Sequence, residues 1–552
     1  MRYNTYPYLY LLSFVWLLLG LHPYSNAQNS GSPTNTPRVE ETEIPPQQDP
    51  YALKYGQTIS AEDLQTHLKI LSSKEYMGRG NGQEGQKMAA NYIADYFQSL
   101  NLPPVGENGD YFQTVKLALS GGSMDVAAWV NNTQFTFLKD FYCFNRSTSN
   151  LQLQTNKITF MGYGIDDAKY SDYGKANVTG QILLVMAGEP MHADSTFWIS
   201  GTNEPSVWTT DWRKKTDIAR QKGAKALLIV TNDIENRVKQ YKNYIMGSEM
   251  MQLEADVKGS NPSEKILNTF YISRDMARQI MGKKNIDALQ ADMNKKGKPK
   301  NKKTTANIKL SITKNTTTAF VENVLGYIEG SDLKNEIIIL TAHYDHLGIE
   351  HGDIYHGADD DGSGTSALLE IAQAFAKAKA DGHGPRRSIL VMPVAGEEKG
   401  LLGSRYYTDI APLFPLKNTV ANLNTDMIGR IDENHKDGNY IYIIGADKLS
   451  SELHLINEKA NQTYTHLQLD YRFNDENDPN RFYYRSDHYN FAKNNIPVIF
   501  YFNGVHEDYH KPTDTEEKIN YPAMTKRAQL TFYTAWELAN RSKRIVVDSN
   551  KK

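Results

Sequence analysis

Two adjacent glutamates, Glu397 and Glu398, directly follow an apolar run that ends at Gly396 in LVMPVAG. Their like charges repel each other and neither side chain suits an apolar core, so an opposite charge should compensate them. A bound metal ion would neutralise one carboxylate and leave the other free to move protons. Neighbouring residues on a loop need not point the same way, so one glutamate can be a ligand and the other a base.

Other side chains of metal-ligand type follow apolar runs in the same way. His343 comes after EIIILTA, Asp426 after TVANLNT, and His510 after IPVIFYF and a short loop, while the acidic stretch GADDDGSG at 357–364 opens a helical pattern. Imidazole and carboxylate without thiolate suit a hydrolytic zinc centre. Because these groups exceed what one ion needs, they predict two Zn²⁺ ions about 3.5–4 Å apart, bridged by a carboxylate and a hydroxide.

The elements that must position these residues form a strand–helix alternation from about residue 319 onward. Near-continuous apolar strands are separated by helical patterns such as 363–379 and 521–541. This arrangement predicts an α/β fold with a mostly parallel mixed sheet that has helices on both faces. In such sheets ligands bind beyond the C-terminal ends of the strands, which is where these histidines and carboxylates lie.

Five motifs in a fixed order carry a family resemblance: HYDHLG, GADDDGSG, GEEKGLLGS, NTDMIGR and YHKPTDT. In that order they resemble the di-zinc exopeptidase family of bacterial leucyl aminopeptidases and glutamate carboxypeptidase II. The resemblance covers about 60–145 and 305–545, and the helix that begins at GRGNGQEG is its N-terminal piece. It implies a zinc-exopeptidase (phosphorylase/hydrolase-like) fold and peptide substrates.

The resemblance also implies a role for each matching residue. Asp360 is selected from the Asp359–Asp361 run because the family's bridging aspartate lies three residues before the SG pair. Glu397 would be the general base, and Asp345 would accept the imidazole N–H of His343 and fix its tautomer. The five zinc ligands would be His343 and Asp426 on one ion, Glu398 and His510 on the other, and Asp360 between them.

Several further residues near these motifs do not match the family's ligands. Asp487 and His488 match a motif outside the metal set, so they are expected to support the site, line the substrate or serve structure alone. No single tyrosine of the 34 can be nominated to stabilise an oxyanion. A surface or supporting role is expected for three other histidines: His346, His351 and His356.

The leading functional hypothesis is a metallo-aminopeptidase. A carboxypeptidase that acts on small acidic peptides is the main alternative, and it would need a basic pocket for the terminal carboxylate. Arg472, Arg481 and Arg485 are available for this, but the sequence does not place them. A single-zinc glutaminyl cyclase and a non-catalytic binding module are disfavoured because all five ligands are present.

The chain of 552 residues is too long for one ordinary domain. Between the two peptidase segments, the pattern changes to strands such as GQILLVMAG, which resembles a protease-associated domain. The predicted organisation is a signal peptide at 1–27, a disordered linker at 28–55, peptidase segments at 56–149 and 305–545, the insertion at 150–292, a Lys-rich linker at 293–304 and a tail at 546–552.

The N-terminus has the layout of a secretory signal peptide: Arg2, an apolar stretch at 8–21, and small residues Ser25 and Ala27 before the cut. Cleavage would leave no membrane span, so the protein is expected in the periplasm or outside the cell. Cys143 is the only cysteine, so no internal disulfide forms. Near balance between 61 basic and 64 acidic residues argues against nucleic acid as a partner, and the oligomeric state stays open.

Overall fold

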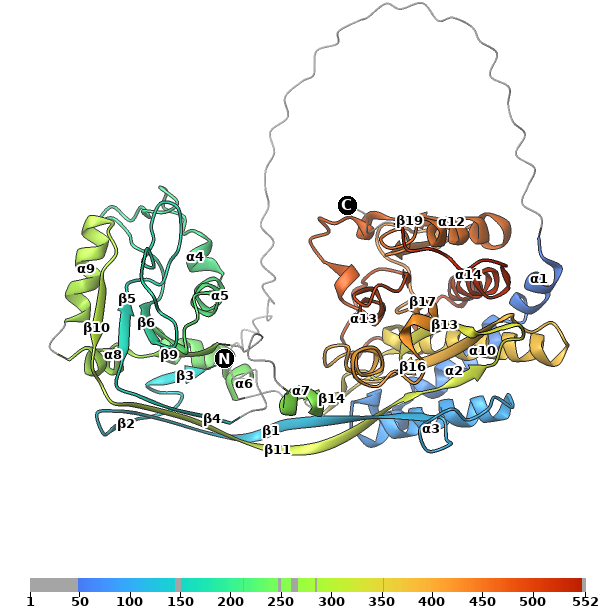
Figure 1. Ribbon diagram of the computed structural model, residues 1–552, viewed down its shortest axis with the longest axis horizontal. Coiled ribbons are helices and arrows are strands. Elements are labelled where there is room, and N and C mark those ends of the chain that lie inside the picture. Colours follow the sequence, from blue (N-terminus) through green and yellow to red (C-terminus); the bar gives the residue numbers. More distant parts are fainter. Residues whose placement is uncertain are drawn as a thin grey trace, which may run out of the picture. The chain divides into compact units, whose positions relative to one another are not determined.

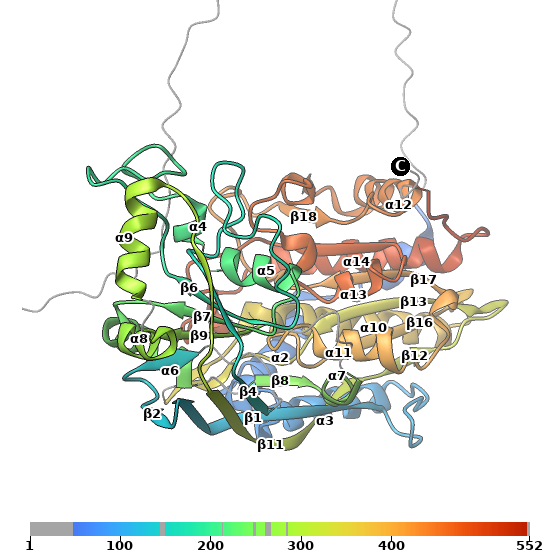
Figure 2. The same cartoon turned by 60° about the vertical axis from the view of Figure 1, so that its left-hand side comes forward.

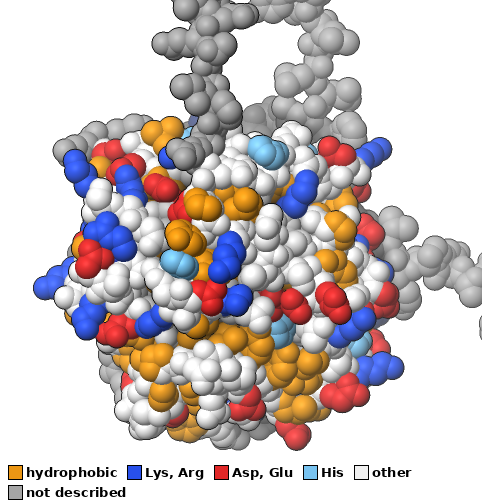
Figure 3. All heavy atoms as spheres, turned by 90° about the vertical axis from the view of Figure 1, so that its right-hand side faces the viewer, with side chains coloured by type: hydrophobic (Ala, Val, Ile, Leu, Met, Phe, Trp, Pro, Cys, Tyr) orange, Lys and Arg blue, Asp and Glu red, His pale blue; other side chains and the backbone are white. Residues whose placement is uncertain are grey.

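The computed structural model describes residues 48–143, 150–211, 213–246, 250–259, 267–282, 285–350 and 352–548. The predicted signal peptide, most of the predicted linker at 28–55, and His351 lie outside these residues. Within them, no helix has the length and apolar character that crossing a bilayer requires. On the face drawn in Figure 3, acidic and basic side chains are interspersed, in keeping with the balanced charge of the chain.

A seven-stranded mixed sheet forms the centre of the part predicted to be a peptidase, hereafter the peptidase part (Figure 1). Four strands, β16, β13, β17 and β20, are parallel to one another. β12 is antiparallel to β16, β18 is antiparallel to β20, and β19 is parallel to β18. The predicted mostly parallel mixed sheet is therefore confirmed. In spatial order the strands are β12 (Gly326–Ile328), β16 (Arg387–Val394), β13 (Leu333–His343), β17 (Thr419–Thr425), β20 (Val498–Phe502), β18 (Tyr440–Ile444) and β19 (Gln468–Asp470).

Helices cover both faces of this sheet, because successive side chains of a buried strand point to opposite sides. Leu340 of β13 belongs to the core that includes α10 (Gly364–Ala380) and α14 (Tyr521–Asn540). Its neighbour Ile339 belongs to a separate core with α13 (His488–Ala492). Figure 2 shows these three helices beside the strands of the sheet.

Three N-terminal helices pack on the α10–α14 side: α1 (Pro50–Gly56), α2 (Ala61–Leu71) and α3 (Glu84–Ser99). The predicted cap of α2 is present, since Ser60 Oγ accepts from the backbone N–H of Asp63 at 3.1 Å. The predicted disordered linker at 28–55 extends too far, because α1 begins at Pro50. Its cap, Asp49, also accepts from the indole N–H of Trp536, a tertiary contact that sequence composition does not reveal.

The remaining elements of the peptidase part are short. A two-stranded sheet, β14 (Gly348–Glu350) and β15 (Asp353–Tyr355), precedes the turn that leads into α10. Helix α11 (Leu402–Arg405) comes after β16 in the chain, and helix α12 (Ser451–Ala460) comes after β18.

A second domain is joined to the peptidase part by a long antiparallel ribbon, β1 (Phe112–Val130) paired with β11 (Ile308–Val324), to which three short strands add in a five-stranded sheet. One half of the ribbon contributes Leu117 to the peptidase core, and the other half contributes Ala128 to a second core. The second domain has its own six-stranded sheet, in the order β10 (Asn301–Thr304), β5 (Ile158–Met161), β6 (Ile182–Met186), β7 (Ala226–Val230), β9 (Asn268–Ile272) and β3 (Phe141–Cys143).

The predicted bounds of the insertion, 150–292, are too narrow. Its core already includes Val126 of β1 and still includes Ile312 of β11. The predicted Lys-rich linker at 293–304 is instead the end of α9 (Ile286–Lys296) and strand β10, which pairs with β5. Lysines on an edge strand look like a linker in sequence because their side chains are solvated in both cases. The other elements of this domain are β2 (Thr133–Phe135), β4 (Leu151–Thr155), α4 (Val207–Thr210), α5 (Arg213–Gln221), α6 (Ile234–Met246) and α8 (Arg274–Met281). Strand β8 (Met250–Leu253), which α7 (Glu254–Gly259) follows, instead pairs with β1 and contributes Met251 and Leu253 to the peptidase core.

The ribbon offers a place to remove the second domain. Ser120 and Thr316 are partners in the ladder, so deleting 121–315 and joining them through Asn-Gly should close a β-hairpin. The predicted zinc ligands all lie outside the deleted segment, so we expect the deletion to bind as much zinc as the full chain and to differ from it in the length of peptide that it cleaves. Stability should fall by a few kcal/mol, because Met251 and Leu253 leave the peptidase core. Metal analysis and cleavage of peptides of graded length check this, and zinc loss in a folded deletion would contradict it.

Candidate metal centre

The predicted site residues all lie at the C-terminal edge of the parallel strands. His343 is the last residue of β13, Asp426 directly follows β17, and the two glutamates follow β16 after a two-residue turn. Asp360 lies in the irregular turn Ala358–Ser363 that leads into α10. His510 comes from the loop after β20.

Asp360 is the centre of this group. Its Oδ1 lies 3.3 Å from His343 Nε2, and its Oδ2 lies 3.1 Å from His510 Nε2. His343 Nε2 is also 3.6 Å from Asp426 Oδ1, and His510 Nε2 is 3.3 Å from Glu398 Oε2. The five predicted ligands therefore form one cluster in which a carboxylate separates two histidine–carboxylate pairs.

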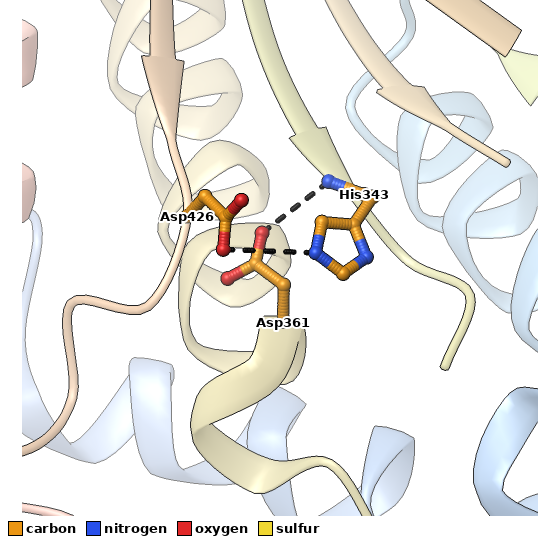
Figure 4. A group of neighbouring side chains, drawn as sticks. All are labelled: His343, Asp361 and Asp426. Atoms are coloured by element: carbon orange, nitrogen blue, oxygen red, sulfur yellow. Dashed lines mark hydrogen bonds and ion pairs between the residues drawn. The ribbon is translucent and has the colours of Figure 1, made fainter. Parts of the chain in front are cut away.

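The carboxylates of the two flanking aspartates, Asp359 and Asp361, accept hydrogen bonds from backbone N–H groups. Asp361 accepts from the backbone N–H groups of His343, Gly364 and Met427, at 3.0–3.3 Å. Figure 4 shows Asp361 at the start of α10, between His343 and Asp426. The Asp361 carboxylate is thus committed to holding the backbone.

Asp359 is committed in a similar way. It accepts from the backbone N–H of Gly429 at 2.6 Å and from Asn503 Nδ2 at 3.1 Å, and it lies 3.2 Å from His506 Nε2. Only Asp360 of the three has a buried carboxylate oxygen, Oδ2, without a hydrogen bond. The structure therefore gives a physical reason to single out the aspartate that the family resemblance selected.

The two adjacent glutamates face different surroundings. Glu398 lies between His510 and His346, whose Nδ1 is 2.9 Å from its Oε1. Glu397 lines the pocket at the site, and its Oε2 is 4.0 Å from His343 Nε2. Burial raises the pKa of Glu397 well above its usual value. One carboxylate is thus enclosed by imidazoles and the other faces the pocket.

His346 belongs to this cluster of side chains, although the sequence analysis placed it outside the ligand set. The surface alternative is wrong, because its side chain is fully buried, with Nδ1 3.8 Å from Asp360 Oδ2. His346, Asp360 and Glu398 lie close enough together to hold one ion. His343, Asp361 and Asp426 form a second such group, but the Asp361 carboxylate in it already accepts three backbone N–H bonds. The sequence signal was present, since His346 lies three residues after His343 in HYDHLG. His356 lies apart from this cluster, with its Nδ1 2.8 Å from the backbone carbonyl oxygen of Ser72.

Asp345 orients His343 through its main chain and not, as predicted, through its carboxylate. Its backbone carbonyl, rather than its carboxylate, lies 3.0 Å from His343 Nδ1, whereas the nearest carboxylate oxygen is 3.9 Å away. The carboxylate accepts from Asn81 Nδ2 at 2.5 Å and from the backbone N–H groups of Glu397 and Glu398 at 3.3 and 3.4 Å. Asp345 therefore holds the glutamate pair in place, and its main chain orients the imidazole.

The RSDH motif supports the site through a residue that sequence reasoning missed. Ser486 Oγ donates to Asp426 Oδ2 at 2.6 Å and accepts from Asn424 Nδ2 at 2.9 Å. The neighbouring Asp487 accepts from Ser404 Oγ and is buried. His488 stacks on Phe500, and burial lowers its pKa to about 3. Of this motif, only Ser486 and Arg485 reach the site.

Arg79, in the GRGNGQEG stretch, fixes the backbone around the site. It is fully buried and donates to the carbonyls of Tyr344, Leu71, His356 and Gly357 at 2.5–2.9 Å. We expect Arg79→Met to lower the free energy of unfolding by at least about 3 kcal/mol, because four buried carbonyls lose a charged donor. Urea unfolding measures this.

The control for Arg79→Met is Arg481→Met, at an exposed position in the same domain. It should change the free energy of unfolding by less than about 0.5 kcal/mol. Equal effects of the two substitutions would refute the structural role of Arg79.

The donor set fits a bound cation. Several buried polar atoms of the group have no hydrogen bond: His346 Nδ1 and Nε2, Asp360 Oδ2 and Glu398 Oε1. Although burial lowers the pKa of His510, the adjacent carboxylates of Asp360 and Glu398 raise it to about 10. The group thus attracts positive charge, and imidazole with carboxylate and no thiolate is a ligand set for zinc.

A pocket opens beside this group, with apolar and polar walls. Met427, Phe482, Phe500, Phe502 and Val505 form the apolar part. Tyr509 and Arg485 form the polar part beside the predicted ligands, and the ring of Tyr509 stacks on that of His510 with 3.9 Å between the ring centroids. The other two candidate arginines are elsewhere: Arg472 pairs with Asp470, and Arg481 lies over the ring of Tyr484.

Comparison with known proteins identifies related sequences for the peptidase part. Residues 323–535 match the model of peptidase family M28. A probable zinc metalloprotease of Pyrenophora teres is 37% identical over 116 residues, which are 20% of this chain and 22% of that protein. Aminopeptidase YwaD of Bacillus subtilis is 32% identical over 139 residues, 24% of this chain and 28% of that protein. A probable glutamate carboxypeptidase of Arabidopsis thaliana is 36% identical over 119 residues, 22% of this chain and 16% of that protein.

These alignments span about a quarter of the length of the curated relatives, or less. A solved structure extends the likeness to most of the chain. The aminopeptidase from Aneurinibacillus sp. strain AM-1 has a TM-score of 0.50 and 19% identity, covering 90% of this chain and 98% of that one. At that identity the likeness concerns the fold, and it agrees with the predicted fold class.

Proposed function

We propose that the protein is a zinc-dependent exopeptidase that removes residues from the N-terminus of peptides. Two observations support the proposal: residues 323–535 match the model of peptidase family M28, and the five sequence motifs lie within that range. The observation that carries the proposal is Asp360, whose two oxygens lie 3.3 and 3.1 Å from His343 and His510. A carboxylate placed between two histidine–carboxylate pairs is suited to bridging two ions.

We propose that two Zn²⁺ ions bind here. His343 and Asp426 would hold one ion, and Glu398 and His510 the other, with Asp360 shared; His346 offers a further nitrogen beside Glu398. When bound, zinc supplies a Lewis acid that polarises a peptide carbonyl and makes water a better nucleophile at neutral pH.

The chain's own contribution to the reaction would be proton transfer by Glu397. Its carboxylate lines the pocket, and its backbone is held because the N–H groups of Glu397 and Glu398 donate to the carboxylate of Asp345. Glu397 would take the proton of the water that attacks the scissile carbonyl. It would then give that proton to the nitrogen of the departing amine, so that the C–N bond breaks and the carboxylate is restored.

The two exopeptidase hypotheses differ in which end of the peptide the enzyme cleaves. An aminopeptidase needs a free N-terminus, whereas a carboxypeptidase needs a free C-terminal carboxylate and tolerates a blocked N-terminus. The experiment is to assay the zinc-loaded protein on Leu-Ala-Ala, on its N-acetylated form and on its C-terminal amide. Cleavage of the amide but not of the acetylated peptide is expected, and the reverse would replace the proposal with a carboxypeptidase.

We further propose that the protein is exported, on the basis of the apolar stretch at 8–21 and the small residues before Gln28. The test is N-terminal sequencing of the protein from fractionated cells. A mature chain that begins near Gln28 outside the cytoplasm is expected, and an intact N-terminus in the cytoplasmic fraction would contradict export.

A further inference from the structure

One arginine lines the pocket beside the candidate metal centre. Arg485 is the only lysine or arginine among the described residues that line it, whereas Asp360, Glu397 and Asp426 line it as carboxylates. The side chain of Arg485 has two contacts. Its Nη2 lies 3.3 Å from the hydroxyl of Tyr509, and its guanidinium carbon lies 5.0 Å from the ring centroid of Phe482.

Two other arginines of this region, unlike Arg485, form ion pairs with aspartates. Arg430 Nη2 lies 3.0 Å from Asp508 Oδ2, and Arg472 Nη2 lies 2.8 Å from Asp470 Oδ2. Neither lines the pocket. In the described ranges of the chain, no carboxylate forms an ion pair with Arg485. No carboxylate of the described residues therefore balances the positive charge of Arg485, which lies at the pocket where a bound peptide would contact it.

We infer that Arg485 pairs with a carboxylate of the bound peptide, so that the preferred substrates carry an acidic group near the scissile bond. This inference rests on the proposed exopeptidase function. A guanidinium has five N–H donors in a fork that matches a carboxylate, and the contact with Tyr509 uses one of them. The contacts with Tyr509 and Phe482 hold the group at the pocket, which reduces the entropy lost on pairing.

The walls of the pocket favour such a pair. Phe482, Phe500 and Phe502 belong to one buried aromatic cluster and exclude water from one side of the pocket. A charge pair beside an apolar wall is screened less than one in open water. The carboxylate could be the side chain of the first residue, the side chain of the second residue, or the C-terminus of a dipeptide.

Matched peptides distinguish these three sources. The pairs are Glu-Ala-NH₂ with Gln-Ala-NH₂, Ala-Glu-NH₂ with Ala-Gln-NH₂, and Ala-Ala with Ala-Ala-NH₂. The kcat/KM of each peptide is measured on the zinc-loaded wild type, Arg485→Gln, Arg485→Lys and the control Arg481→Gln. Arg481 is also exposed and has no carboxylate partner among the described residues, but it lies outside the pocket lining.

We expect the wild type to prefer the acidic member of at least one pair. Arg485→Gln should lower that preference ratio about tenfold, the size of a partly solvated charge-assisted hydrogen bond. Arg485→Lys should keep part of the ratio, and Arg481→Gln should keep all of it. Equal rates within every pair in the wild type, or an unchanged ratio in Arg485→Gln, would overturn the inference. Failure to cleave any peptide would instead refute the proposed function.

Discussion

Replacing Glu397 by glutamine is expected to lower turnover roughly 10²–10⁴-fold while the protein keeps its zinc. Glutamine preserves the size of the side chain but cannot accept the proton of the attacking water. Glu397 faces the pocket, and its carboxylate oxygen is 4.0 Å from the nearest imidazole nitrogen of His343. The measurement is kcat and KM on an N-terminally free peptide, with zinc content determined on the same sample.

The matched control is the neighbouring Glu398→Ala. Its carboxylate lies 2.9 Å from His346 Nδ1 and 3.3 Å from His510 Nε2, so its loss should weaken zinc binding directly. KM of Glu397→Gln should change far less than kcat. Full zinc with near-normal turnover in Glu397→Gln, or zinc loss there with retention in Glu398→Ala, would show that the two roles are reversed.

Removing the metal is expected to abolish activity altogether, and adding zinc to restore it. The centre brings three carboxylates together with two histidines, and this excess of acidic groups calls for cations. We expect Asp360→Asn to lose more zinc than a substitution at any other ligand, because Asp360 contacts both histidines. Metal analysis after dialysis against a chelator, followed by titration with zinc, checks both statements.

Two histidine substitutions refine the zinc prediction. His510→Ala should lower zinc content from the proposed two ions toward one, because His510 lies beside both Asp360 and Glu398. His346→Ala tests whether the buried imidazole beside Glu398 also binds the ion. Full activity after exhaustive chelation, or undiminished zinc in Asp360→Asn, would contradict the proposed centre.

Much of the fold could be predicted because it depends on local patterns. Buried parallel strands are apolar along their whole length, so EIIILTA and SILVMPV identified β13 and β16 within a few residues. The limits of the second domain could not be predicted in this way. The ribbon strands β1 and β11 each contribute to two cores, and no change of composition marks the point where one core ends.

The sequence by itself determined which chemical groups are available and in what order they follow the strands. Strand ends and their ligand-type residues are adjacent in the chain, so a parallel sheet must bring them to one edge. The resemblance to the di-zinc exopeptidases then selected His343, Asp360, Glu398, Asp426 and His510 as ligands and Glu397 as the base.

Only the tertiary structure decided how each of these groups is used. Which aspartate of the Asp359–Asp361 run has a free oxygen depends on backbone amides supplied by distant segments, such as that of Gly429. The burial of His346 against Glu398 and the placement of Arg485 at the pocket also depend on chain segments far apart in sequence. Hydrogen bonds and burial between remote segments leave no periodic trace in a single sequence, which is why residue types were predictable and their partners were not.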